Sequence, residues 1–392
     1  MNTLNMKQHA IPAAIVMIAG VVASCSGEKD PQPDPMQSAK ESMTLIYAVA
    51  SNNLYSNFRE DSLEMLTGVR DIDLEANAVM VFSVRPVGTG SNRTYVQQLQ
   101  RIIRNKQGQP EFALAKTYDF EHLATDPAMI SQVIGDALDI AKAPANGLIF
   151  WSHGTGWAPS FTKHNTSGVK RSFGLDQSAG GKDECDIIEL AQAIPDGKFG
   201  YIWFDCCYMG SIELVYELKD KTPWVVGYPT EIYAAGMNYD ETLPHLVTGT
   251  PDLQGAADEL KESYENSAFT IGITETARLP HLARIAKAAY TGEKPSTFHL
   301  QNYCRGSYGP FYDLGEVVRR FGETATEPFD ATAWNEALGE AVAYRYTYDY
   351  DFNNREIDKN QFSGLTVAFP ETFQSDVNLE YYHKLTWYKD TH

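Results

Sequence analysis

The 392-residue sequence is poor in cysteine and in basic residues, and each scarcity excludes a class of protein. Its five cysteines include no C-x-x-C pair, so a disulfide-dense scaffold and a structural zinc site are both excluded. Lysine and arginine total 32 against 51 acidic residues, and the net charge of −19 opposes binding to nucleic acid. That charge either attracts basic substrates or serves only solubility. We expect no metal or other cofactor from these residues.

Long apolar runs are also scarce, and the one at the N-terminus, Ile11–Ala23, is too short to span a bilayer. It has the length of a signal-peptide core and ends in Val22-Ala23-Ser24-Cys25, which resembles a bacterial lipobox. We expect Cys25 to become the lipidated first residue of an exported protein anchored in the cell envelope. The alternative is an ordinary secretory signal followed by an incidental cysteine. Outer-membrane or surface placement is open.

Composition divides the chain into four stretches. Residues 1–24 are the expected signal peptide, and residues 25–42, rich in Pro, Asp and Lys, are a flexible tether. Residues 43–249 alternate strand-like and helical patterns, which predicts a mostly parallel sheet covered by helices. Residues 250–392 are expected to form further helices and a late strand at 362–370. The first helix, after the strand at 43–50, should bury Phe58, Leu63, Met65, Leu66 and Val69.

The segment Lys198–Glu217, KFGYIWFDCCYMGSIELVYE, delivers two thiols to the end of a strand. Its apolar run 201–204 is typical of a strand buried on both faces, and Asp205-Cys206-Cys207 follow directly. Apolar residues then recur at helical spacing, which predicts a helix beginning near Cys207. Open α/β sheets place their sites at strand ends, and a helix N-terminus favours thiolate over thiol.

A second segment, Ala145–Trp157, has the same pattern: an apolar strand at 148–151 followed by Ser152-His153-Gly154. If the two strands are parallel neighbours, His153 and the thiols share one rim of the sheet. Such a Cys/His pair is the arrangement that nucleophilic thiol catalysis requires. The alternative is a buried cysteine pair with an unrelated loop histidine. Either strand, taken alone, would favour this alternative.

Together the motifs HGTGW at 153–157 and DCCYM at 205–209 resemble those of the clostripain-like (C11-type) cysteine peptidases of the caspase-fold superfamily. The resemblance starts near Met43 and includes the Asn52-Asn53-Leu54 turn after the first strand. A small residue is usual where this chain has Cys206. The alignment therefore makes Cys207 the nucleophile and Cys206 its neighbour.

The resemblance implies a caspase-like α/β/α sandwich with a mostly parallel central sheet and an α+β C-terminal elaboration. Residues 43–249 would be the catalytic core and residues 250–392 the C-terminal part of the same peptidase unit. His153 would serve Cys207 as base and then as acid, while the backbone N–H groups of Gly154 and Cys207 form an oxyanion hole. No third residue that would orient the histidine stands out. Trp157 is expected to pack around the histidine loop.

Peptidases of this family cleave after Arg or Lys, so the resemblance implies protein or peptide substrates with basic residues. Asp205 then has two interpretations: a pocket floor that pairs with a substrate arginine, or a cap for the helix beginning near Cys207. Glu231, on the next rim loop, could be a second acid in the pocket. Residues 228–237 match the family less well, which leaves a peptidase of different specificity as an alternative. A catalytically decayed lipoprotein that only binds is another.

Some members of this family cut themselves in the loop after the catalytic histidine. Here that loop carries Lys170 and Arg171, which are either a self-cleavage site or simply solvated charges. Calcium dependence also occurs in the family, but this chain has no D-x-D-x-D-G loop, so calcium stays open. We expect a monomer.

Overall fold

The computed structural model describes residues 40–88, 90–157, 173–180, 183–296, 299–303, 311–369 and 376–392. All of them belong to the unit of the chain that begins at Pro35. Cys25 with the signal peptide, most of the tether, Lys170 and Arg171 lie outside the described residues. Lipid attachment and self-cleavage therefore stay predictions. In the described ranges, no helix combines the length and the apolar character needed to cross a membrane.

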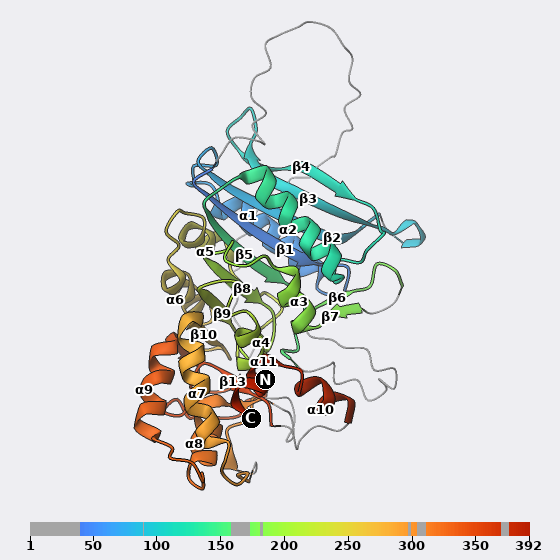
Figure 1. Cartoon of the computed structure of the whole chain (residues 1–392). Helices are drawn as coiled ribbons and strands as arrows, with labels where there is room; N and C mark the ends of the chain where they lie inside the picture. The colour runs from blue at the N-terminus through green and yellow to red at the C-terminus, as the bar shows by residue number, and fades with distance from the viewer. Residues whose placement is uncertain are drawn as a thin grey trace, which may run out of the picture. The chain divides into compact units, whose positions relative to one another are not determined.

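The described part of the chain is built around a nine-stranded sheet of order β12-β10-β9-β8-β5-β1-β2-β3-β4 (Figure 1). The neighbours β2, β1, β5, β8 and β9 pair in parallel, whereas β3 and β10 are antiparallel to the strands beside them. The strands are β1 Ser42–Val49, β2 Asn77–Val87, β3 Thr94–Arg104, β4 Pro110–Tyr118, β5 Ala145–Trp151, β8 Tyr201–Asp205, β9 Trp224–Gly227, β10 Thr270–Glu275 and β12 Val342–Thr347. The predicted mostly parallel sheet is confirmed, and residues beyond 250 complete it.

Two short antiparallel pairs accompany the main sheet. One joins β6 Phe173–Asp176 to β7 Asp183–Cys185, and the other joins β11 Tyr312–Asp313 to β13 Thr366–Val367.

The central strands are mostly apolar because helices cover both faces of the sheet. Successive side chains of a strand point to opposite faces. In β5 and β8, Leu148, Phe150, Ile202, Phe204 and the following Cys206 therefore join one core, and Ile149, Trp151, Tyr201 and Trp203 join the other. We call the first the A face and the second the B face.

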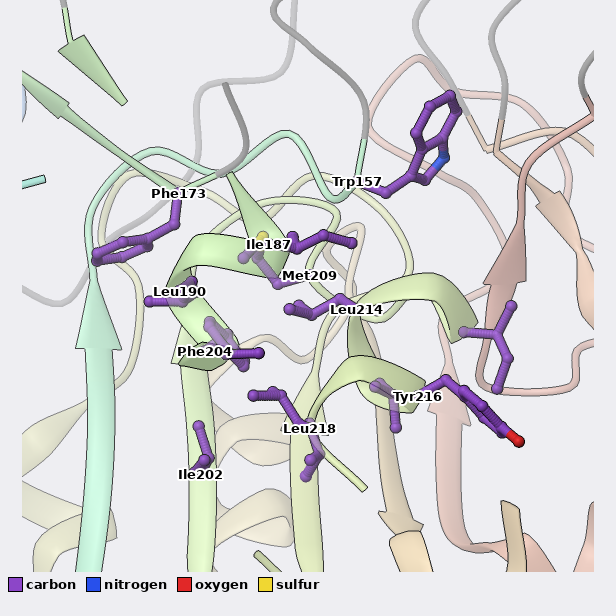
Figure 2. Packing of buried hydrophobic residues seen from close by; sticks show 14 of the residues in the cluster. Trp157, Phe173, Ile187, Leu190, Ile202, Phe204, Met209, Leu214, Tyr216 and Leu218 are labelled. Atoms are coloured by element: carbon purple, nitrogen blue, oxygen red, sulfur yellow. The ribbon is translucent and has the colours of Figure 1, made fainter. Parts of the chain in front are cut away.

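Helices of the A face come from the middle and the C-terminal end of the chain. They are α2 Pro127–Ala141, α3 Ile187–Ala193, α4 Ile212–Glu217, α7 Leu279–Ala289, α8 Leu314–Gly322, α9 Ala331–Ala341, α10 Asp376–Tyr382 and α11 Thr386–Thr391. Figure 2 shows how the A face packs, with Met209 beside Leu214 and Phe204 beside Leu190.

The B face is covered by α1 Tyr55–Gly68, α5 Tyr239–Leu246 and α6 Leu253–Ser263. On α1 the sequence prediction is partly wrong. Leu63 is 60% exposed, and the buried positions include Asp61 together with Phe58 and Met65. An acid thus occupies a position on the helix face where an apolar residue is usual.

Local signals predicted some boundaries and missed others. Asp126 caps α2 as predicted, accepting from the Ala128 N–H at 2.8 Å, with Pro127 at the first helical position. The helix predicted at 334–344 stops at Ala341, and the chain continues as β12 because β10 offers a partner strand. In the late segment 362–370, strand pairing covers Thr366–Val367, and the terminal helix predicted at 379–387 is two helices, α10 and α11. Tertiary pairing overrides local propensity at these places.

Candidate active site

The two motif-bearing strands are neighbours at the same rim of the sheet. β5 and β8 are neighbours in the sheet (Figure 1). They pair in parallel, and their register sets Trp151 opposite Asp205. His153 and Cys207 each follow two residues after these paired positions. The equal offset brings the histidine and the thiol to one rim from adjacent strands.

Gly154 brings the histidine loop close to the cysteine segment. A Cβ atom built on it would lie 2.6 Å from the Cys207 carbonyl oxygen and 2.8 Å from Cys206 Cβ. Only a glycine allows this approach of the histidine loop to the backbone of the cysteine segment. β6 holds the loop from its other side, since the Gly174 N–H donates to the His153 carbonyl at 3.0 Å.

The two adjacent thiols have opposite surroundings. Cys206 is 1% exposed, and its Sγ donates to the Phe150 carbonyl at 3.3 Å within the A-face core. Burial raises the pKa of Cys206 well above the usual value, which keeps it a thiol. Cys207 is partly exposed, and its Sγ donates to the Ile232 carbonyl at 3.6 Å. Of the two, Cys207 is the one that a substrate can reach.

The chain turns sharply after Cys207 and does not enter a helix there. Tyr208 has a φ of 61°, in the left-handed region that non-glycine residues rarely adopt. Its N–H donates to the Thr230 carbonyl at 3.0 Å, and its ring stacks on Phe311 at 4.9 Å between centroids. The strained turn is therefore held by two neighbouring segments.

The prediction of a helix beginning near Cys207 is wrong. α4 begins at Ile212, where the Ser211 side chain accepts from the Leu214 N–H at 3.4 Å. Between turn and helix, the Gly210 N–H donates to the Tyr228 carbonyl at 3.0 Å, a pairing that a helix would prevent. Asp205 is consequently not a helix cap, and no helix N-terminus lies at the Cys207 thiol.

His153 has a partner that the sequence did not single out. Its Nε2 lies 2.9 Å from Asn53 Oδ1, and because an amide oxygen only accepts, the ring proton belongs on Nε2. Nδ1 is then the basic nitrogen. Burial lowers the pKa of His153, which favours the neutral, proton-accepting ring.

The turn that carries Asn53 follows β1, the strand next to β5 in the sheet. Asn52 holds this turn, since its Nδ2 donates to the carbonyls of Val49 and Leu175, each at 2.9 Å. The signal available in the sequence was a polar turn ending a strand. Which strand lies beside the histidine strand is decided by the topology.

Asp205 faces the B side and is almost completely buried, with 4% exposure. Its Oδ2 accepts from the Met237 N–H and the Tyr239 hydroxyl, both at 3.1 Å. Its Oδ1 is buried and has no hydrogen-bond partner among the described residues. Burial raises the pKa of Asp205 to about 6, and the two donors oppose that shift.

One loop contacts both Asp205 and Cys207. Gly236, with a φ of +60°, lies so close to the carboxylate that a Cβ atom there would sit 2.8 Å from Asp205 Oδ2. Ile232, in the same loop, accepts from the Cys207 thiol. Glu231 precedes Ile232 and is partly exposed. The structure thus places Glu231 on the same loop, directly before the residue that accepts from the thiol.

The C-terminal part of the chain supports the segment after Cys207. The Gly210 carbonyl accepts from the Thr366 N–H at 2.9 Å. Glu213 Oε1 accepts from the Ala368 N–H at 2.6 Å and from the Tyr382 hydroxyl at 3.2 Å. Burial raises the pKa of Glu213 to about 7. Trp157 is buried against Tyr382, with ring centroids 4.9 Å apart, in a packing role.

No group of three or more His, Cys, Asp or Glu side chains in the described ranges is arranged to hold a metal ion.

Comparison with known proteins identifies a family model that matches the chain and solved structures that share its fold. A sequence model of the clostripain family matches residues 46–280, more than half of the chain. No curated protein matches.

Three solved structures share the fold. A secreted C11 cysteine protease from Bacteroides thetaiotaomicron, in complex with an irreversible peptide inhibitor, is 22% identical, with TM-score 0.74 over 90% of this chain and 99% of that one. An inactive zymogen C11 protease from Parabacteroides distasonis is 23% identical, with TM-score 0.73 over 91% and 99%. A second structure of a secreted C11 cysteine protease from B. thetaiotaomicron is 24% identical, with TM-score 0.73 over 91% and 100%. These likenesses confirm the expected caspase-like α/β fold.

Proposed function

This chain belongs to the clostripain family and is a cysteine peptidase, and we propose that Cys207 and His153 are its catalytic dyad. The observation that carries the proposal is the parallel pairing of β5 with β8, which brings both residues to one rim. The burial of Cys206 supports Cys207 as the nucleophile.

In the proposed reaction the Cys207 proton passes to Nδ1 of His153, and Sγ attacks the carbonyl carbon of the scissile bond. The tetrahedral intermediate collapses to a thioester as His153 donates that proton to the leaving amine. Water, deprotonated by the same ring, then releases the acid product and restores the thiol. Asn53 keeps Nδ1 free for both transfers by accepting from Nε2.

We propose that the backbone N–H groups of Gly154 and Cys207 stabilise the oxyanion. The close approach of Gly154 to the Cys207 backbone supports this pairing. Removing one such donor typically lowers kcat by about 10²- to 10³-fold.

We propose cleavage after Arg, and less efficiently after Lys, with Asp205 as the acid that binds the side chain. A buried carboxylate with an unpartnered oxygen suits the bidentate donors of a guanidinium better than the single point of an ammonium. Because Asp205 is 4% exposed, the loop that carries Ile232 and Gly236 must shift for a substrate side chain to reach it. Glu231 on that loop is proposed as a second acid.

A panel of fluorogenic peptides that differ at the residue before the scissile bond tests this function. We expect hydrolysis after Arg and Lys, and its loss in the Cys207→Ala variant. Cleavage after small or acidic residues would indicate a peptidase of different specificity. A folded protein that binds but cuts none of the peptides would indicate a decayed enzyme.

We further propose that the protein is exported, is anchored by lipid at Cys25 and cuts itself after Lys170 or Arg171. The lipobox-like segment and the two basic residues in a polar stretch of the sequence support these proposals. Cys25→Ser should release the protein from membranes. Intact-mass analysis should find a junction after residue 170 or 171 that is absent from the Cys207→Ala form.

A further inference from the structure

Two further acids lie on the B face beside Asp205, and both come from α1. The Trp151 indole N–H donates to Asp61 Oδ2 at 2.7 Å, and the sheet register sets Trp151 directly opposite Asp205. Tyr239 links the other acid: its hydroxyl donates to Asp205 Oδ2 and its N–H donates to Glu64 Oε2, both at 3.1 Å. We call Asp61, Glu64 and Asp205 the B-face acids.

The B-face acids lie in a negative, desolvated environment. Asp61 is 2% exposed, and within the described residues no Lys or Arg forms an ion pair with any of the three. Burial, reinforced by neighbouring acids, raises the pKa of Asp61 to about 9 and that of Glu64 to about 7. The other titratable groups facing them are Glu60, Asp240, Tyr228, Tyr239 and Tyr264.

Buried carboxylates are normally paired with a cation or fully hydrogen-bonded. The B-face acids have no cation, and Asp205 Oδ1 has no partner among the described residues, although the atom is fully buried. That oxygen lies next to the loop that carries Gly236, 3.0 Å from where a Gly236 Cβ would be. Asp205 Oδ1 is therefore a buried acceptor without a donor among the described residues, and a cationic hydrogen-bond donor would satisfy it.

We propose that Asp61 is a second specificity-determining acid, which joins Asp205 in holding the guanidinium of a substrate arginine. The inference rests on the proposed role of Asp205. When the cation enters beside Asp205, its charge favours the ionised form of Asp61. The carboxylic O–H bond of Asp61 then breaks, and its proton passes to a base of the buffer. The guanidinium ends between two carboxylates, and no oxidation or reduction is involved.

The first experiment compares peptide substrates that carry arginine or citrulline before the scissile bond. Citrulline has nearly the same shape as arginine but carries no charge, so the ratio of their kcat/KM values reports recognition of the cation. We expect Asp61→Asn to lower this ratio about tenfold or more, chiefly through KM for arginine. An equal loss on both substrates, or an unchanged ratio, would overturn the inference.

Asp313→Asn is the matched control. Asp313 is also fully buried, at 0% exposure, but it accepts from three donors in the C-terminal part of the chain. We expect this variant to keep the arginine-to-citrulline ratio of the natural enzyme, whatever it does to stability. A ratio that falls as far as in Asp61→Asn would show a general effect of removing a buried acid, and would overturn the inference.

The second experiment needs no change at Asp61. Agmatine, a small guanidinium compound, is titrated into the Cys207→Ala protein at pH 8 in buffers of different ionisation enthalpy. Asp205 and Glu64 are already ionised at that pH, whereas Asp61 is not. We expect release of about one proton for each agmatine bound. Binding without proton release would overturn the role of Asp61 and leave Asp205 in place. If agmatine does not bind and arginine and citrulline substrates are hydrolysed equally, the proposed basic specificity is wrong. The inference about Asp61 then fails with it.

Discussion

Asp205 and Asp313 are buried to nearly the same extent, with 4% and 0% exposure, and burial raises the pKa of each to about 6. They differ in their hydrogen bonds. Asp313 Oδ1 accepts from the Glu316 N–H, and its Oδ2 accepts from the Ser363 N–H and the Tyr303 hydroxyl. Asp205 has both donors on Oδ2 and none among the described residues on Oδ1. A shifted pKa therefore marks burial in both places, whereas the unpartnered oxygen marks the acid that is suited to a ligand.

Two pairs of adjacent residues at the rim, Cys206 with Cys207 and Asn52 with Asn53, show a similar contrast between a buried and a more exposed member. Cys206 faces the A-face core and donates to Phe150, and Cys207 faces the loop that carries Ile232. Asn52 is buried and holds its own turn, while Asn53 is exposed and reaches His153. In each pair the buried member is expected to support the fold and the more exposed member to serve the reaction.

The largest effect should separate the two cysteines. Cys207→Ala should lower peptide hydrolysis by at least about 10³-fold, because the attacking sulfur is gone. Cys206→Ala should retain most activity and lose some stability through the small cavity it leaves. Initial rates on an arginine peptide, with thermal melts of both variants, measure this. Loss of turnover in Cys206→Ala with activity retained in Cys207→Ala would reverse the assignment.

The next effect should separate the two aspartates. Asp205→Asn should lower kcat/KM for arginine peptides roughly a few hundredfold, since breaking a buried charge pair costs about 3–5 kcal/mol. Asp313→Asn should instead lower the melting temperature and leave kcat/KM nearly unchanged, because its three donors belong to the fold. An Asp205→Asn enzyme with undiminished efficiency on arginine substrates would make Asp205 a structural acid like Asp313.

A smaller effect should separate the two asparagines. Asn53→Ala should lower kcat about 10- to 100-fold with little change in KM, because the His153 ring loses the acceptor that orients it. The fold should be unaffected, since Asn53 is exposed. Asn52→Ala should destabilise the turn after β1 and broaden the melt. A kcat unchanged in a well-folded Asn53→Ala enzyme would count against an orienting role.

The smallest effect is a dependence on pH. Because Asp205 must be ionised to bind a cation, KM for arginine peptides should rise as pH falls through about 6. The contribution of Asp205 to stability has the opposite sign. A carboxyl with a raised pKa in the folded protein stabilises the fold at low pH, and that stabilisation is lost as pH rises from its unfolded pKa, near 4, through about 6.

Arginine and citrulline substrates measured between pH 5 and pH 8 test this, because the titration of His153 cancels in their ratio. Asp205→Asn should abolish the step in the ratio near pH 6, and Asp313→Asn should keep it. A ratio that is flat with pH in the natural enzyme would mean that the acid binding the substrate is not Asp205.

Much of the fold could be predicted because its signals are local. Apolar runs marked β1, β5 and β8, and Asp126-Pro127 marked the start of α2. The motifs around His153 and Cys207 identified the family that the sequence model matches. Helix boundaries near partner strands could not be predicted, since residues 342–347 become β12 only by pairing with β10.

By itself, the sequence determined which residues end the two central strands, because apolar runs and the polar residues that follow them are local properties of the chain. The tertiary structure decided which residues those side chains meet. The strand order places Asn53 beside His153. The alternation of side chains along β8 and the residue after it directs Cys206 into the A-face core. The packing of α1 on the B face set Asp61 beside the residue opposite Asp205. These contacts join residues about 100 positions apart or more, or depend on which face a side chain takes, and no local pattern carries that information.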